Sequence, residues 1–104
     1  MEKRLSDLSK YELEQEIQAL HERKRKAEQM GMVSEIEVVL RRIAIAESYL
    51  VDPTSFRPGE TYVVNYNDQP FRLKFVNGVM GWGTFEGDMT ERAIPLSELS
   101  EVKR

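Results

Sequence analysis

The chain has 104 residues, no cysteine, a single histidine (His21), and 15 basic against 18 acidic side chains, for a formal net charge of −3. Without cysteine, the chain has no disulfide, no thiolate nucleophile and no Cys-based metal site. A mildly acidic chain does not coat nucleic acid or anionic membrane through bulk charge. With 40% hydrophobic and 32% charged residues, the composition is typical of a folded chain of one domain, or of two very small ones.

The N-terminal residues are charged and no apolar stretch follows them, which is unlike a secretory signal. The longest run without a charge, residues 75–85, is interrupted by glycines and falls well below the roughly 20 apolar residues that cross a bilayer. We therefore expect a cytoplasmic protein with no membrane partner.

The first predicted element is a helix that starts at Ser9. Ser9 and Glu12 have the spacing of a capping box, and Gly31 fits the left-handed residue that often ends a helix. Between them, apolar residues recur at helical spacing: Leu13, Ile17, Leu20, Ala27 and Met30.

A second helix is predicted to start near Ser34, where Glu37 repeats the capping-box spacing. It should end before Asp52-Pro53, because proline disfavours helical geometry in the residue before it. The short connection predicts an antiparallel hairpin. The stripe expected to face the first helix consists of Ile36, Val39, Leu40, Ile43, Ala46 and Leu50.

The second helix has another apolar stripe, Val38, Ile45 and Tyr49, nearly opposite the first. A helix that is apolar on two faces is normally buried on two faces. We expect this stripe to pack on the C-terminal half of the chain. The alternative is a surface for a protein partner or a homodimer.

The C-terminal half predicts short strands separated by turns. All four prolines and five of the six glycines follow Asp52. Strands are predicted over residues 61–66, 71–76, 79–85 and 92–94, with a short helical turn near residues 95–99 and a fifth strand at Val102. We expect an α+β protein in which a helical hairpin (residues 1–52) packs on a small β-barrel (residues 53–104) as one cooperative unit.

Asn77-Gly78 is the strongest hairpin signal in the chain. If these two residues form a type I′ loop, the register between the flanking strands is fixed. The pairs are then Val76 with Val79, Phe75 with Met80, Leu73 with Trp82, and Phe71 with Thr84. This register places Phe71, Leu73, Phe75, Met80 and Trp82 in the core.

In the same register, Lys74 lies opposite Gly81 and Arg72 lies opposite Gly83. The glycines allow the strand to coil and close the barrel. Alternatively, they leave a flat surface without side chains beside the two cations, where a phosphate or carboxylate could bind. The sequence leaves both interpretations open.

The one basic run is Arg23, Lys24, Arg25 and Lys26, near the end of the first helix. Cations in this position complement the helix dipole and solvate the exposed face. The alternative is an anion or nucleic-acid contact, although consecutive helical residues fan around the helix and form no flat patch. We expect His21 to be a surface residue.

Several short segments, spread nearly end to end, resemble those of a known family. They are Glu2-Lys3-Arg4, Lys26-Ala27-Glu28-Gln29 followed by Gly31, Ser48-Tyr49-Leu50, Pro58-Gly59-Glu60-Thr61-Tyr62, Asn77-Gly78-Val79 with Trp82-Gly83, and Ala93 with Pro95. The chain resembles the YfhH family of small uncharacterised proteins from Bacillus and relatives. The resemblance implies a helical hairpin followed by an SH3-like small barrel, and it carries no established activity or catalytic residue.

No residue pattern indicates catalysis, a cofactor or a metal. We therefore expect a non-enzymatic protein-interaction or regulatory module, with Val38, Ile45 and Tyr49 as candidate partner contacts. The alternative is a nucleic-acid-binding accessory protein that uses Arg72, Lys74 and residues 23–26, a function that the net acidity of the C-terminal half does not favour.

Overall fold

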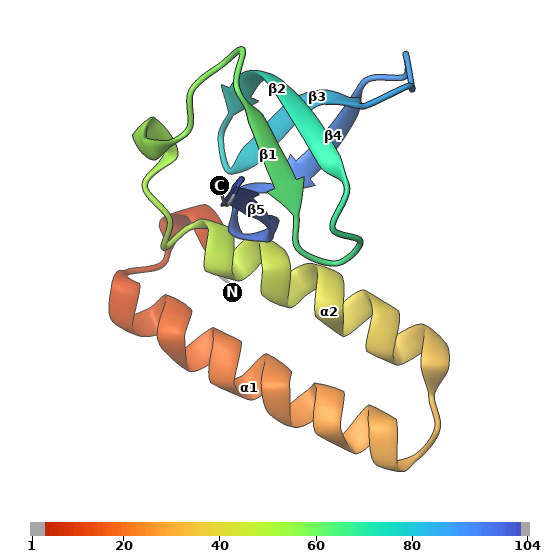
Figure 1. The fold of residues 1–104 in the computed structure, drawn as a ribbon. Coiled ribbons are helices and arrows are strands. Elements are labelled where there is room, and N and C mark those ends of the chain that lie inside the picture. The colour runs from red at the N-terminus through yellow and green to blue at the C-terminus, as the bar shows by residue number, and fades with distance from the viewer. Residues whose placement is uncertain (1–3, 103–104) are drawn as a thin grey trace. The chain divides into compact units, whose positions relative to one another are not determined.

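The computed structural model describes residues 4–102 and shows two helices followed by a five-stranded antiparallel sheet (Figure 1). The predicted α+β class is confirmed. The chain divides into two compact units between Leu50 and Val51, close to the predicted boundary after residue 52. The helices form the first unit and the sheet forms the second.

The first helix, α1, spans Lys10–Gln29 and follows a short 3-10 turn, η1, at Leu5–Asp7. Its predicted capping box is confirmed in both halves. The Ser9 hydroxyl accepts a hydrogen bond from the Glu12 N–H, and the Glu12 carboxylate accepts one from the Ser9 N–H, each at 3.1 Å. Gly31 has a φ of +67°, so the left-handed residue after the helix is also confirmed.

Replacing Ser9 with alanine should lower the free energy of unfolding by about 1 kcal/mol, because the Glu12 N–H loses its acceptor at the helix start. Urea unfolding of the full chain followed by circular dichroism measures this change. Ser6→Ala, in the preceding exposed turn, is the control and should stay within about 0.5 kcal/mol of wild type. Equal effects of the two substitutions would argue against the capping role.

The second helix, α2, spans Val33–Ser48, and the capping box predicted at Ser34 and Glu37 is wrong. Met32 occupies the N-cap position without a side-chain cap. The Met32 N–H donates back to the Ala27 carbonyl at 2.9 Å, the bond that closes α1 after a left-handed glycine. One residue therefore both ends α1 and begins α2, so Ser34 already lies inside the first turn.

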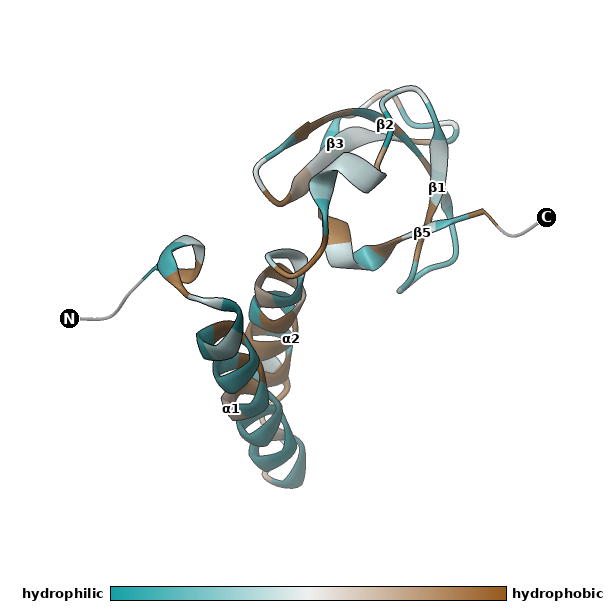
Figure 2. Cartoon of the chain, turned by 90° about the vertical axis from the view of Figure 1, so that its left-hand side faces the viewer, coloured by the Kyte–Doolittle hydropathy of each residue, from teal (hydrophilic) through white to brown (hydrophobic). Residues whose placement is uncertain are grey.

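The two helices bury a narrow seam of Leu20, Val39, Ile43 and Ala46, with Ile17 and Leu5 packed against it. Figure 2 shows why the seam is narrow: α1 is hydrophilic over most of its surface. The predicted stripe was too wide. Leu40 and Leu50, both expected in the seam, are 46% and 40% exposed.

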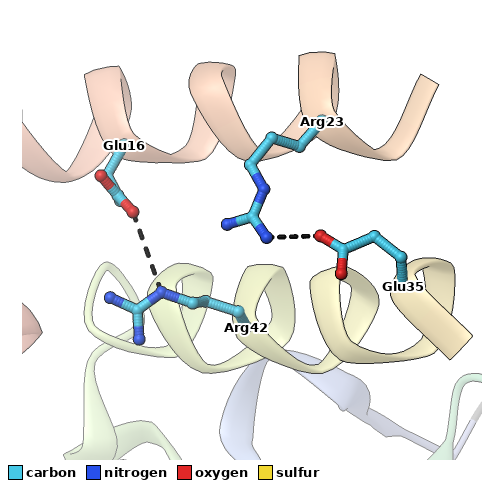
Figure 3. A network of polar contacts seen from close by, with 4 residues as sticks. All are labelled: Glu16, Arg23, Glu35 and Arg42. Carbon is cyan, nitrogen blue, oxygen red and sulfur yellow. Dashed lines mark hydrogen bonds and ion pairs between the residues drawn. The ribbon is translucent and has the colours of Figure 1, made fainter. Parts of the chain in front are cut away.

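Two ion pairs connect the helices on the same side of this seam, at different points along their length (Figure 3). Arg23 of α1 donates to Glu35 of α2, and the Arg42 Nε of α2 lies 3.8 Å from a Glu16 oxygen of α1. All four side chains are substantially exposed, so each pair stabilises the hairpin by no more than about 1 kcal/mol. The pairs agree with the antiparallel pairing that the short turn predicts.

The sheet has the strand order β4-β3-β2-β1-β5, with every neighbouring pair antiparallel. The sheet is curved (Figure 1). Its edge strands, β4 and β5, do not pair with each other in the described part of the chain, so the sheet is open. The predicted closed barrel is therefore not observed. A 3-10 turn (η3, Leu96–Glu98) precedes the last strand, which begins earlier than expected. The strands are β1 (Thr61–Val64), β2 (Pro70–Asn77), β3 (Met80–Phe85), β4 (Arg92–Pro95) and β5 (Leu99–Glu101).

The core of this unit is built from side chains on the inner face of the sheet and from the turn before β5. Phe71 and Leu73 of β2 are fully buried at its centre. Phe56 and Phe85 are partly buried and pack against it, with ring centroids 5.3 Å from those of Tyr62 and Phe71 respectively. The buried set is Tyr62, Val64, Phe71, Leu73, Ile94, Leu96 and Leu99.

The hairpin between β2 and β3 exists, but the predicted register is wrong. Asn77 pairs with Met80, so the two-residue loop is Gly78-Val79. Within this loop only Gly78 has a positive φ, +62°, which is typical of a type II′ turn with glycine first. A turn shifted by one residue along β2 changes every pairing that follows from it.

Candidate functional site

A β-bulge in β2 turns one large aromatic residue out of the core. The register shifts between Leu73 and Phe75, so Lys74 is an extra residue on its strand. Beyond this point the alternation that buries Phe71 and Leu73 is reversed, and Phe75 is 43% exposed. Bulges re-aim side chains in this way and are frequent beside functional sites.

Phe75 stacks on Trp82 of the neighbouring strand. The two residues are directly paired across β2 and β3, and their rings are nearly parallel, with an interplanar angle of 7° and centroids 6.0 Å apart. Trp82 is half-buried. The prediction that both side chains belong to the core is therefore wrong, and the outward aromatic pair is a feature that sequence reasoning missed.

The two glycines that flank Trp82 are the sequence signal that could have revealed its outward orientation. Gly81 and Gly83 are both buried, because they occupy the inward positions of β3. A Cβ on Gly83 would lie 1.9 Å from the Arg72 carbonyl oxygen. A Cβ on Gly81 would lie 3.0 Å from Leu73 Cδ1. Two inward glycines force the tryptophan between them to point outward.

The flat glycine surface predicted beside Lys74 and Arg72 is not present in the structure. Gly81 pairs with Val76, and Gly83 pairs with Leu73, so neither faces a cation. Both glycines lie on the inner side of the sheet, where their lack of a side chain makes room for core packing and for the backbone of β2. An anion could not reach them from solvent.

Arg72 lies instead between two threonines on the outer face. Thr61 pairs with Arg72 across β1 and β2, and Arg72 pairs with Thr84 across β2 and β3. Arg72 is exposed and makes no ion pair with any residue of the described chain, 4–102. This row lines a shallow groove of about 390 Å³, whose lining consists of Thr61, Pro70, Arg72, Thr84, Phe85, Glu86, Gly87 and Asp88.

Two carboxylates, Glu86 and Asp88, also line the groove, and Asp88 is already engaged in a hydrogen bond and an ion pair. Asp88 accepts a hydrogen bond from the Thr90 N–H at 2.8 Å, and its Oδ2 lies 3.5 Å from a guanidinium nitrogen of Arg92. The Thr90 bond is the main cause that lowers the pKa of Asp88, so this carboxylate is ionised at neutral pH. Glu86 is exposed on the rim.

Half of the six cations that the sequence suggested for anion binding are paired with carboxylates. Lys74 Nζ lies 3.6 Å from a Glu91 oxygen. In α1, Arg25 pairs with Glu22 at 2.6 Å and Arg23 pairs with Glu35. Lys24 is half-buried, and Lys26 and Arg72 are exposed.

The second stripe of α2 is only partly covered. Val38 is 60% exposed and Tyr49 is 36% exposed, whereas Ile45 is half-buried. These residues remain a candidate partner surface. Another exposed apolar cluster, which sequence reasoning did not single out, surrounds the turn between the helices, where Met30 and Val33 are 73% and 67% exposed.

The side chains of residues 4–102 contain no group of three or more His, Asp or Glu residues close enough to hold a metal ion. Over the same residues, neither helix has the length and apolar character needed to cross a membrane. The features of the sheet unit's surface that remain to be explained are the stacked pair of Phe75 and Trp82 and the position of Arg72 between two threonine hydroxyls.

Comparison with known proteins places the chain among relatives over nearly its whole length. The profile of a family described as "Protein of unknown function (DUF1811)" matches residues 3–100. A protein of Bacillus subtilis (strain 168) described as "Uncharacterized protein YfhH" is 42% identical over 102 residues, which cover 97% of this chain and 98% of that protein. The resemblance recognised in the sequence is thus confirmed.

Proposed function

Because this chain belongs to the DUF1811 family, whose function is unknown, we propose its function from its surface: it is a non-enzymatic protein-binding module that docks a partner on the outer face of its sheet. One observation carries the proposal. The fold turns Phe75 outward through a bulge and stacks it on Trp82, although the strand pattern would bury it.

Exposed, pre-stacked aromatic side chains suit a protein contact. Aromatic residues are enriched at the centres of interfaces, where they bury large areas and lose little conformational entropy. Here the rings already restrain each other, so binding would immobilise few additional rotamers. The local sequence pattern and the structure disagree at this point, and such disagreements concentrate at functional sites.

A nucleic-acid partner is the second candidate, and charge weighs against it. Single strands bind grooves that combine stacking platforms with many cations along the backbone path. Around the aromatic pair, Lys74 is engaged with Glu91 and Arg92 with Asp88. Within residues 4–102, this leaves Arg72 as the cation of this part of the sheet that has no ion pair. A single cation that is not already paired with a carboxylate offers little counterion release.

The fold of the sheet unit supports an interaction role. We propose that this curved sheet is an SH3-like small barrel that stays open between β4 and β5, in keeping with the fold that the family resemblance implied. The strand order β4-β3-β2-β1-β5, the curvature of the sheet and the 3-10 turn before β5 support this assignment. The stripe of Val38, Ile45 and Tyr49 on α2 is a secondary candidate for a partner or homodimer contact.

Site-specific photo-cross-linking tests the proposal. Benzoylphenylalanine at position 75 of the full chain, expressed in Bacillus subtilis, should give a discrete adduct that protease removes and nuclease does not. The control is the same group at Tyr66, another exposed aromatic of the sheet unit, which should give no such adduct. Nuclease-sensitive adducts, or the same pattern at both positions, would remove the basis for the proposal.

A further inference from the structure

We infer that the outer face of the sheet takes an extended acidic peptide segment, in which one carboxylate side chain precedes or follows an apolar side chain by two residues. The inference rests on the proposed function and specifies the chemistry of the partner. Two adjacent rows of side chains carry it: an upper row of Thr61, Arg72 and Thr84, and an aromatic row of Phe75 and Trp82.

The upper row provides a carboxylate site. The Arg72 guanidinium has no ion-pair partner in the described structure, and a guanidinium matches a carboxylate with two parallel hydrogen bonds. Thr61 and Thr84 are its direct neighbours on either side, and their hydroxyls can donate to the same anion. The groove that these residues line gives the ligand space beside the sheet.

The spacing of the two rows sets the spacing of the ligand. Thr84 and Trp82 are two residues apart on β3, so the rows are separated by about 7 Å along the strand. In an extended peptide, side chains at positions i and i+2 point to the same face at that same separation. A carboxylate on Arg72 therefore places the apolar side chain over Phe75 and Trp82.

The charges near this surface favour one carboxylate over a polyanion. Glu86 and Asp88 line the groove beside Arg72, and the Lys74 charge is balanced by Glu91. A second anionic group on the ligand would approach these carboxylates and be repelled. Nucleic acid, which carries a charge at each nucleotide, is thus the less suitable ligand.

Peptide titrations followed by Trp82 fluorescence test the inference, since Trp82 is the one tryptophan of the chain. The probes are acetyl-Ala-Asp-Ala-Leu-Ala-amide and the same peptide with Asn in place of Asp. We expect the Asp peptide to bind about tenfold more tightly, as expected for a charge-assisted contact. Arg72→Ala should abolish this difference. Arg41→Ala, which removes an equal charge from an exposed site on α2, should preserve it.

Several results would overturn the inference. They are equal affinities for the Asp and Asn peptides, no fluorescence change at about 5 mM peptide, and tighter binding of an oligothymidylate than of the Asp peptide. Circular dichroism verifies that the Arg72 and Arg41 variants remain folded. A protein adduct from position 75 combined with equal peptide affinities would leave the proposed function standing and reject only this ligand class.

Discussion

Gly83→Ala should destabilise the protein by about 3 kcal/mol or more, or prevent the sheet from folding, because the new Cβ would lie 1.9 Å from the Arg72 carbonyl oxygen. The obstacle is backbone, which cannot rotate away as a side-chain end can. The strands would have to separate at the bulge to admit the methyl group. Urea unfolding of the full chain measures the loss.

Gly81→Ala is the matched control for this substitution. It lies on the same strand and the same inner face, but its new Cβ would meet side-chain ends alone: those of Leu73 and Leu99 at 3.0 Å, and that of Leu96 at 3.4 Å. These side chains can shift, so we expect a cost of about 1–2 kcal/mol. If Gly83→Ala were no more costly than Gly81→Ala, the close approach of β2 and β3 would be incorrect.

Phe71→Ala should lower the free energy of unfolding by about 3–5 kcal/mol, whereas Phe75→Ala should lower it by about 1 kcal/mol. Phe71 is fully buried at the centre of the sheet core, and its loss leaves a cavity. Phe75 is 43% exposed, and its main loss is the stacking on Trp82. The two residues have the same side chain and the same strand, so each serves as the control for the other.

Denaturant unfolding with both single variants decides between the two registers. The register predicted from the turn places both phenylalanines in the core, and comparable losses for the two variants would support it. Unequal losses in the stated order support the bulge. A fluorescence change at Trp82 in Phe75→Ala, without a large loss of stability, would show directly that the two rings are in contact.

The helical half was largely predictable because its signals are local. Ser9, Glu12 and Gly31 act on backbone groups within one turn of themselves, and each was placed correctly. The start of α2 was missed because the bond from the Met32 N–H to the Ala27 carbonyl uses residues from both helices at once. A capping pattern read along one helix does not contain that information.

In the sheet half, the existence of the strands was predictable and their register was not. The alternation of Phe71, Leu73 and Phe75 is that of an uninterrupted strand, and nothing in it marks Lys74 as an extra residue. The constraint comes from β3, where Gly83 admits the backbone of β2. It depends on a contact between strands, so propensity and periodicity along either strand alone cannot reveal it.

The candidate site was also only partly predictable, because some of its features depend on contacts between distant residues. Composition and spacing identified Arg72 and Lys74 as possible anion contacts. Which of them keeps an ion pair depends on Glu91, a residue that tertiary structure brings to Lys74. The alternating pattern predicts that Phe75 and Trp82 are both core residues, each paired with another partner, because such a pattern gives no reason to expose one of its members.

The most direct test of the bulge and of the outward aromatic pair is proton NMR of the full chain, with nuclear Overhauser contacts assigned across β2 and β3. We expect contacts between the rings of Phe75 and Trp82, and between the backbones of Asn77 and Met80. Backbone contacts of Phe75 with Met80 and of Leu73 with Trp82 would instead establish the uninterrupted register. The aromatic pair would then be part of the core, and the proposed binding surface would not exist.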